Sequence, residues 1–333
     1  MTKSQIKPSY IVVSFFVLAL SIALLISPDV YMKSVLNGIL LWGTAVLPAL
    51  FPFFFFTKLL TELQVVDVLA VRLEWLMRKL YNVPGVTSYA FCLSMLSGYP
   101  IGAKLVSELY EKQALSKGAV YRTVAFTSTS GPLFVIGTVG VGMFASKLAG
   151  IIILVSHLIS ALLNGLVWRK FKLDKNETTP NMKTTPRDLG KVLSDSIYSS
   201  ITSVLVVGGY IALFFMAIDV LNNLHVLSAL ADGLGFCLNF LGLPGNVASG
   251  IASGIIEITR GCFDLNKSGA SIGVIIVAAT AIISWGGFSI HLQALTFLKK
   301  CGINMGIYFT QKLTHCLISI VTSTLCVLLF GLL

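Results

Sequence analysis

The chain has 333 residues, of which 56% are hydrophobic and 11% are charged, and its mean hydropathy is +0.88. A soluble domain carries roughly 25% charged residues, so this composition excludes an ordinary soluble protein and indicates a chain embedded in a lipid bilayer. The net charge of +10 comes from basic residues between apolar runs. Without a basic stripe interleaved with aromatic residues, that charge does not indicate a nucleic-acid partner.

The residues that commonly build metal or catalytic sites are scattered along the chain. None of the six cysteines forms a CxxC pair, and the four histidines show no metal-ligand spacing. The sequence also lacks a nucleophile–base pair and a phosphate-binding glycine loop. It therefore predicts no metal, no cofactor and no enzymatic activity.

The first apolar run covers residues 10–27 and follows two lysines, Lys3 and Lys7. It is longer than the hydrophobic region of a secretion signal, and no small-residue cleavage site follows it. We therefore predict that residues 1–30 form a retained N-terminal membrane span.

A second span is predicted over residues 36–56, with a bend at Pro48 and Pro52. Residues 58–85 are mixed and charged, which is typical of a segment at the membrane interface. The apolar piece SYAFCLSML comes next and stops at SGYP (97–100). It is too short to cross about 30 Å of hydrocarbon, so we expect it to enter the membrane and return.

An amphipathic helix of about fifteen residues is expected after SGYP. The long apolar segment 119–145 follows and is interrupted in its middle by TSTSGP (127–132). Residues 148–168 form an uninterrupted predicted span. Residues 169–191 form a hydrophilic linker.

The second half of the chain offers similar segments. A span is predicted over 195–220, and a short piece over 246–261 contains the sequence GIASG. The long segment 269–298 is interrupted by SWGGFS (284–289). The last predicted span covers 306–333.

The interruptions are spaced alike in the two halves. Gly131 follows Gly98 by the same number of residues as Gly287 follows Gly254. Each half therefore has the order span, re-entrant hairpin, broken helix, span. Because each half crosses the membrane three times, an odd number, we expect the two halves to be inverted relative to each other, as in many secondary transporters.

A further match supports this repeat, because LVSHLIS around His157 resembles KLTHCLIS around His315. The predicted fold is an all-α polytopic membrane protein, with an inverted repeat and one N-terminal span, about seven spans and two hairpins in total. The predicted domains are the N-terminal span (1–30), a first repeat (36–168), a cytoplasmic linker (169–191) and a second repeat (192–333).

Orientation follows from the basic residues. If the N-terminus is cytoplasmic, all of the 24 lysines and arginines lie in cytoplasmic loops, hairpin flanks or span ends, except Lys33, Lys147, Arg260 and Lys267. Basic residues concentrate on the cytoplasmic side of membrane proteins. We therefore predict a multi-pass cell-membrane protein with its N-terminus inside and its C-terminus outside.

The four interruptions also predict the functional site. Non-helical backbone at membrane depth persists only when it is buried in protein or lines a cavity, and the N-termini of half-helices offer free N–H groups. The candidate substrate-binding residues are Gly98, Tyr99, Pro100, Gly102, Lys104, Ser130, Gly131, Glu257, Thr259, Arg260, Gly286, Gly287 and Ser289.

Ionisable residues near the interruptions are candidates for function because charges are costly inside a membrane. Lys104 and Glu108 are four residues apart and Glu257 and Arg260 three apart, so each pair shares a helix face. Each pair therefore forms either an internal ion pair or contacts to substrate or to a coupling ion. With two cations and several helix N-termini, an anionic substrate that carries a carboxylate is favoured.

A coupling ion, H⁺ or Na⁺, is expected as a second partner. His291 follows SWGGFS and could carry a proton, whereas His157 and His315 are typical of packed or hydrogen-bonded histidines. The candidate coupling residues are Glu108, Glu257, His291 and Gln293.

Four motifs in order, SGYPIGAK, TSGPLFVIGTVGVGMF, GIIEITRG and WGGFSIHLQ, resemble the YlbJ/SpoVV family of sporulation integral membrane proteins. That family is part of the wider group with a nucleoside-recognition Gate domain. The resemblance covers roughly residues 36–333 and implies two Gate-type repeats, similar to the core of concentrative nucleoside transporters. It marks the residues Gly98, Tyr99, Pro100, Gly102, Lys104, Ser130, Gly131, Pro132, Glu257, Thr259, Gly286, Gly287, Ser289, His291 and Gln293.

The resemblance further implies a permease for dipicolinic acid during spore formation, which agrees with the anionic substrate favoured by the charges. We therefore expect a secondary transporter of a small organic anion. Two alternatives stay open, a nucleoside or nucleobase transporter and a membrane scaffold protein with a degenerate transport core. The sequence leaves the oligomeric state open.

Overall fold

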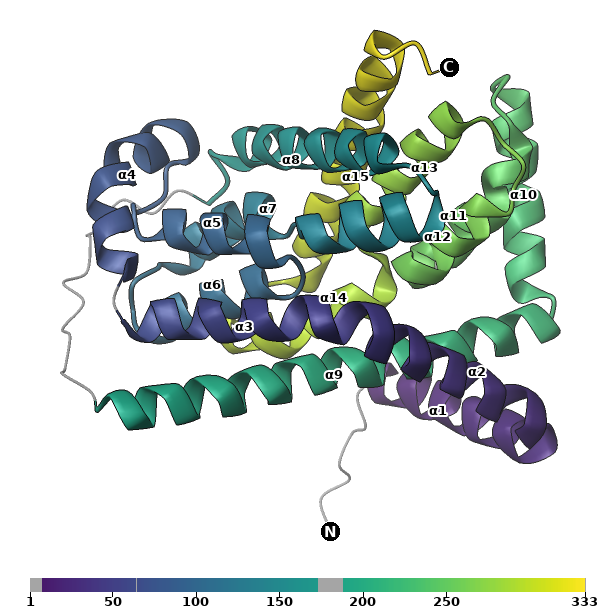
Figure 1. Cartoon of the computed structure of the whole chain (residues 1–333), viewed down its shortest axis with the longest axis horizontal. Coiled ribbons are helices and arrows are strands. Elements are labelled where there is room, and N and C mark those ends of the chain that lie inside the picture. The colour runs from purple at the N-terminus through teal and green to yellow at the C-terminus, as the bar shows by residue number, and fades with distance from the viewer. Residues whose placement is uncertain (1–7, 64, 173–187, 333) are drawn as a thin grey trace.

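The structure is a computed structural model that describes residues 8–63, 65–172 and 188–332, and every regular element in these ranges is a helix (Figure 1). Lys3, Lys7 and most of the predicted linker 169–191 lie outside the described residues. The predicted all-helical fold is confirmed for the part of the chain that the structure describes.

The N-terminal helices α1 (Pro8–Ile26) and α2 (Pro28–Leu41) meet at a bend of 115°. The second predicted segment begins at Pro28 instead of residue 36. Proline at the first position of a helix loses no hydrogen bond, because that N–H has no partner inside the helix, so helix can start there.

Helix continues from α2 through the π-helical turn η1 (Trp42–Val46) into α3 (Leu47–Glu62). Pro48 has no N–H to offer the carbonyl of Thr44, and its ring would clash with that carbonyl. In the wider turn the N–H of Leu47 donates to the oxygen of Trp42, five residues back. The structure thus places the irregularity one turn before the predicted bend at Pro48 and Pro52.

The rest of the first half contains the predicted hairpin and broken helix. Its elements are α4 (Val65–Tyr81), α5 (Thr87–Ser97), α6 (Ile101–Glu111), α7 (Lys117–Thr127), the π-helix η2 (Leu133–Met143) and α8 (Lys147–Trp168). Helices α5 and α6 pack against each other and form the first hairpin, and residues 128–132 separate α7 from η2. The interruptions predicted at SGYP and TSTSGP are therefore present.

The second half likewise contains a hairpin, a broken helix and a long final helix in that order. Its elements are α9 (Leu189–Asn223), α10 (Val226–Phe240), η3 (Gly245–Val247), α11 (Ala248–Ile256), α12 (Ile258–Asn266), α13 (Ile272–Trp285), α14 (Gly287–Leu298), η4 (Lys299–Cys301) and α15 (Met305–Leu329). Helices α11 and α12 form the second hairpin, and Gly286 separates α13 from α14. Helices α3 and α9 pack along one face of the molecule (Figure 1).

The prediction of a break at GIASG (250–254) is wrong, because α11 runs through these residues and the second hairpin turns at Glu257. Glycine is found in this helix because neighbouring residues pack so closely that they leave no room for a Cβ. A Cβ at Gly254 would lie 2.7 Å from Ile282 Cδ1, and one at Gly261 would lie 2.4 Å from Gly254 Cα. These glycines allow close helix packing instead of breaking the helix.

The two halves contact each other in the core through α8 and α15. The rings of His157 and His315 lie 4.9 Å apart. On one side of them Thr314 Oγ1 donates to Asn164 Oδ1, and on the other Thr322 Oγ1 donates to the carbonyl of Ser156. Under the histidine alignment Ser156 corresponds to Thr314 and Asn164 to Thr322, so exchanging the halves exchanges the two contacts.

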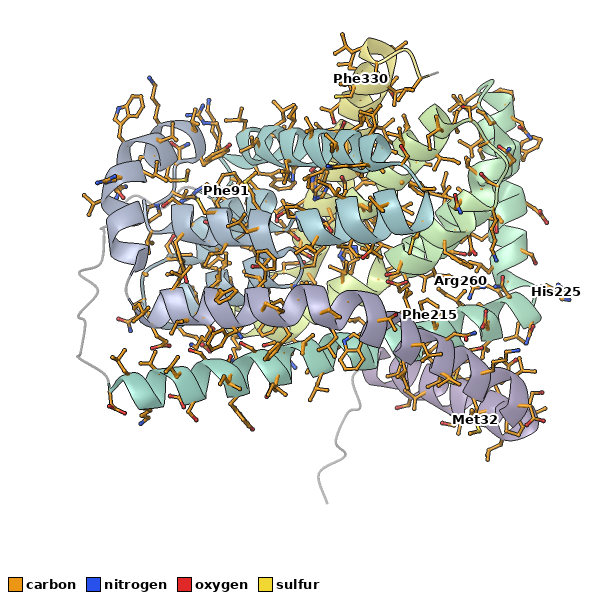
Figure 2. The ribbon with its side chains drawn as sticks, in the orientation of Figure 1. Met32, Phe91, Phe215, His225, Arg260 and Phe330 are labelled. Carbon is orange, nitrogen blue, oxygen red and sulfur yellow. The ribbon has the colours of Figure 1, made fainter. Side chains whose placement is uncertain are left out.

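Four helices in the described residues are long and apolar enough to cross a membrane, or up to five if the bent pair α1–α2 counts as one span. They are Lys147–Trp168, Leu189–Asn223, Ile272–Cys301 and Met305–Leu329. The other predicted spans fall on shorter or interrupted helices, α3 and α7–η2. Apolar side chains such as Met32 and Phe330 are exposed at the periphery (Figure 2), as expected of a lipid-facing surface.

Within each half, the interruption of the broken helix touches the hairpin. A Cβ at Gly98 would lie 2.4 Å from the backbone nitrogen of Gly131, and one at Gly287 would lie 2.9 Å from the carbonyl oxygen of Ile256. Gly98 has φ +80° and Gly287 has φ +67°, a region that other residues rarely adopt. Glycine is therefore required at both positions by conformation and by space.

We expect Gly98→Ala to lower the free energy of unfolding by about 2 kcal/mol or more, because it combines an unfavourable φ with a clash against backbone. Thermal unfolding in detergent checks this. Gly137→Ala is the matched control, because a Cβ at Gly137 has nothing within 4 Å. An equal loss of stability in both variants would contradict the proposed contact between Gly98 and Gly131.

Candidate functional site

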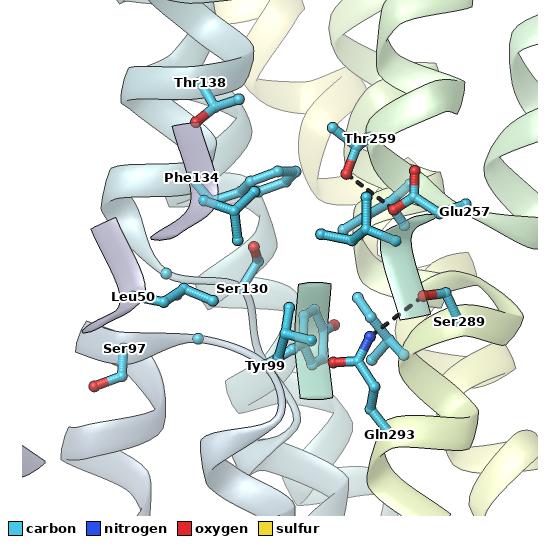
Figure 3. Close-up of a pocket in the computed structure, with 17 residues that line it drawn as sticks. Leu50, Ser97, Tyr99, Ser130, Phe134, Thr138, Glu257, Thr259, Ser289 and Gln293 are labelled. Atoms are coloured by element: carbon cyan, nitrogen blue, oxygen red, sulfur yellow. Dashed lines mark hydrogen bonds between the residues drawn. The ribbon is translucent and has the colours of Figure 1, made fainter. Parts of the chain in front are cut away.

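A cavity of about 570 Å³, open solvent included, lies where the hairpins and broken helices of the two halves meet (Figure 3). Its apolar wall comes from Val46 and Leu50 near the π-turn and from Val207 and Ile211 of α9. Its polar lining comes from residues at or beside the interruptions.

The N-terminal ends of four half-helices lie beside this cavity. Residues that line the cavity stand at or just before the first turns of α6, η2, α12 and α14. The first N–H groups of a helix have no partner inside it and carry a partial positive charge. The cavity therefore offers a concentration of N–H dipoles at one place.

Glu257 is the one charged residue among the cavity lining of the described chain, and only 2% of it is exposed. Its Oε2 accepts a hydrogen bond from the backbone N–H of Arg260 at 2.8 Å, and its Oε1 accepts one from Thr259 Oγ1 at 2.9 Å. The carboxylate thus caps the N-terminus of α12 and opposes the positive end of that helix.

Neutral polar groups complete the lining. Gln293 Nε2 donates to Ser289 Oγ at 3.2 Å, and both side chains come from α14 (Figure 3). Ser130 and Thr138 contribute hydroxyls from the first half. This arrangement provides several donors and acceptors for one bound molecule.

Tyr99 separates the cavity from a buried lysine. The Tyr99 hydroxyl donates to the carbonyl oxygen of Ile283 at 3.1 Å and accepts from Lys312 Nζ at 2.7 Å. Lys312 lies on α15 and is 2% exposed. A cation is thus held one side chain away from the cavity.

The structure brings about half of the predicted site residues to the cavity. Those that line it are Gly98, Tyr99, Ser130, Gly131, Glu257, Thr259, Ser289 and Gln293. Those that lie outside its lining are Pro100, Gly102, Lys104, Glu108, Arg260, Gly286, Gly287 and His291.

Lys104 projects from α6 toward α9 instead of the cavity. Its Nζ donates to Ser199 Oγ and Ser203 Oγ, each at 3.0 Å. Within the described residues it forms no ion pair with Glu108. The hydroxyls of α9 capture the ammonium because they lie across the helix interface.

Arg260 is neutralised by two carboxylates, and neither belongs to Glu257. It lies 3.2 Å from Asp219 of α9 and 3.2 Å from Asp264 of its own helix, and it stacks near Phe215 (Figure 2). The expected side-chain pair between Glu257 and Arg260 does not form, since Glu257 binds only the Arg260 backbone.

His291 is packed among aromatic rings, with Trp285 at 4.5 Å and Phe309 at 4.8 Å between centroids. Neither of its ring nitrogens has a hydrogen-bond partner within the structure. By contrast, His157 is hydrogen-bonded as predicted, since its Nε2 accepts the backbone N–H of Ser130 at 2.9 Å.

Sequence reasoning missed Lys312. A signal was present, because a lysine inside an apolar span is costly and indicates function. In the alignment of the two histidine motifs, Lys312 stands where the first half has Leu154. A lysine at a position where the other half has a leucine could have marked Lys312 as a candidate site residue.

Comparison with known proteins agrees with this geometry. The Gate family, described as nucleoside recognition, matches residues 44–147. The sporulation integral membrane protein YlbJ of Bacillus subtilis (strain 168) is 29% identical over 329 residues, which cover 92% of this chain and 80% of YlbJ. The chain is a homologue of YlbJ. The family resemblance predicted from the four motifs is thereby confirmed.

Two solved structures of CNTnw variants share the fold. One, in an intermediate state, has a TM-score of 0.54 at 11% identity and covers 92% of this chain and 86% of CNTnw. The other, in an outward-facing state, has a TM-score of 0.56 at 12% identity and covers 94% and 86%. The YlbJ homologue is therefore an integral membrane protein with several spans and a CNT-like fold.

The role of Glu257 as a helix cap can be tested by stability. We expect Glu257→Leu to lower the free energy of unfolding by about 1 kcal/mol, because two donors at the start of α12 lose their acceptor. Glu257→Gln keeps one acceptor oxygen and should lose less. Thermal unfolding in detergent, with hydrogen exchange of the α12 amides, measures both. A Gln variant as unstable as the Leu variant would contradict the capping role.

Proposed function

We propose that the protein is a secondary transporter that moves a small organic anion, with the cavity between the hairpins as its substrate site. The observation that carries this proposal is the convergence of four half-helix N-termini on one cavity. Discontinuous helices of this kind form substrate sites near the bilayer midplane in transporters.

The charges around the cavity favour an anion over a cation. Each helix N-terminus acts as roughly half a positive charge, and Lys312, when protonated, adds a full one behind Tyr99. Glu257 opposes them but is occupied by the cap of α12. The same interruptions also hold the C-terminal ends of α5, α7, α11 and α13, so the preference for an anion rests on a protonated Lys312, whose effect the low dielectric of a membrane interior strengthens.

The membrane arrangement that fits this function has seven spans and two hairpins, with the halves inverted. The N-terminus is cytoplasmic, the C-terminus is outside, and the first hairpin enters from the cytoplasmic side. The distribution of lysine and arginine supports this orientation. The contacts of α8 and α15 that exchange with the halves support the inverted repeat.

Dipicolinic acid is the leading candidate substrate. It is a small dicarboxylate, and the homology to a sporulation protein supports a role in spore formation. Lys104 and Arg260 are not required to touch it in this conformation, since the cavity lining excludes both. The coupling ion is H⁺ or Na⁺, and among the candidate coupling residues only Glu257 and Gln293 reach the cavity.

A neutral nucleoside is the second candidate. Gln293, Ser289 and Thr259 offer the amide and hydroxyl groups that would bind base and ribose, and Glu257 could accept from a sugar hydroxyl. The description of the matching Gate family as nucleoside recognition also supports it.

Equilibrium binding of dipicolinate and of uridine to Glu257→Gln separates the two candidates. If the substrate is an anion, removal of the nearby like charge should tighten dipicolinate binding by about fivefold. If the substrate is a nucleoside, loss of the charged acceptor should weaken uridine binding about tenfold.

Lys104→Met is the matched control, because it removes a cation outside the cavity and should change either Kd by less than about threefold. Saturable uridine binding together with no dipicolinate binding would overturn the anion proposal. Flux of the bound ligand into proteoliposomes then tests whether binding leads to transport.

A further inference from the structure

Lys312 has the surroundings of an ammonium group. An ammonium has three N–H donors, and each one here has an acceptor. Nζ lies 2.7 Å from the Tyr99 hydroxyl, 3.0 Å from the carbonyl oxygen of Ser128 and 3.4 Å from His315 Nδ1. The hydrogen of the Tyr99 hydroxyl points to Ile283, so the Tyr99 oxygen is free to accept.

The two central histidines fit this arrangement in their neutral forms. His315 Nδ1 accepts from Lys312, so the proton of His315 is on Nε2, 3.3 Å from the carbonyl of His157. His157 Nε2 accepts from Ser130 N–H, so the proton of His157 is on Nδ1, which donates to Ser284 Oγ at 2.8 Å. Neither ring supplies a charge.

The ammonium lacks a counter-charge. Among the residues that the structure describes, no carboxylate lies within ion-pair distance of Lys312 Nζ. The titratable groups that face it are Tyr99, His157, His291, His315 and Cys316, and the Tyr308 hydroxyl lies farther away, on Ser128 Oγ. None of them is an acid that is ionised near neutral pH, so a protonated Lys312 is a buried, unbalanced positive charge.

An anion in the cavity would supply the missing negative charge. Only the side chain of Tyr99 stands between Lys312 and the cavity, with Nζ 4.8 Å from the centre of the Tyr99 ring. A bound anion therefore stabilises the protonated form of Lys312. By reciprocity, the protonated form binds the anion more tightly than the neutral amine does.

Lys312 also joins the two halves. Tyr99 is at the tip of the first hairpin and Ser128 is at the interruption after α7, whereas Lys312 lies on α15 of the second half. Loss of the proton removes one of the three donated hydrogen bonds. The protonation state of Lys312 therefore affects contacts between the parts that must move against each other in transport.

We infer that Lys312 takes up a proton when an organic anion enters the cavity and releases it when the anion leaves, so that anion and proton move together. The inference rests on the proposed function. The step transfers H⁺ from a hydronium ion of the solvent to the lone pair of the Lys312 amine, so that one O–H bond breaks, one N–H bond forms, and water and an ammonium result. No other bond is made or broken.

The test measures proton uptake while dipicolinate is added to the purified full chain in weakly buffered detergent solution. We expect the wild type to take up as much as one proton per bound dipicolinate. Its dipicolinate Kd should rise about tenfold per pH unit over the range in which Lys312 loses its proton. In Lys312→Met both the proton uptake and the pH dependence should vanish.

Lys104→Met is the control, because Lys104 is likewise hydrogen-bonded to hydroxyls, but those of Ser199 and Ser203 do not line the cavity, so uptake should persist. Dipicolinate binding without proton uptake by the wild type would overturn the inference and leave the proposed function intact. Uptake that persists in Lys312→Met would assign the proton to another group, such as Glu257 or His291, and would also overturn it.

Failure of the wild type to bind dipicolinate would overturn the dicarboxylate proposal and the inference together. If Lys312→Met does not fold, the wild type alone tests the inference, through its proton uptake per bound dipicolinate and the pH dependence of its dipicolinate Kd. Uridine serves as a neutral probe. Proton uptake on uridine binding would contradict the charge-balancing role of Lys312.

Discussion

Backbone N–H and C=O groups inside a membrane have no water to bind, so every interruption of a helix must be satisfied by protein. In this fold the interruptions are buried against one another, Gly98 against Gly131 in the first half and Gly287 against Ile256 in the second, and the N–H of Ser130 is satisfied by His157 Nε2. The same packing brings four helix N-termini together. The cavity is therefore a direct consequence of how the broken helices are kept stable in lipid.

The interruptions could be predicted from sequence because they depend on local chemistry. Gly98, Gly131 and Gly287 stand where glycine clusters with polar residues, or with proline at the first two, within otherwise apolar runs, and such clusters weaken a helix locally. The predicted break at residues 250–254 was wrong because its outcome depends on tertiary contacts instead of local chemistry. Gly254 is helical because Gly261 and Ile282 pack against it, and these contacts are tertiary.

The side-chain partners of the charged residues could not be predicted in the same way. Helical spacing placed Lys104 beside Glu108 and Arg260 beside Glu257, but the hydroxyls and carboxylates that bind these cations come from other helices. Spacing along one helix predicts which of its own residues are neighbours. It does not predict which side chains of other helices will contact them. Lys312 illustrates the same limit, since Tyr99 and Ser128 reach it from distant parts of the chain.

If the chain works as the proposed transporter, the correspondence of Lys312 with Leu154 bears on the balance between its two open forms. When a transporter alternates by exchanging the shapes of two related halves, identical halves would make its inward-open and outward-open forms equal in free energy. Here one half carries an amine where the other carries an isobutyl group. Under the proposed mechanism the two forms would therefore differ in free energy at rest, and this difference would depend on the protonation state of Lys312.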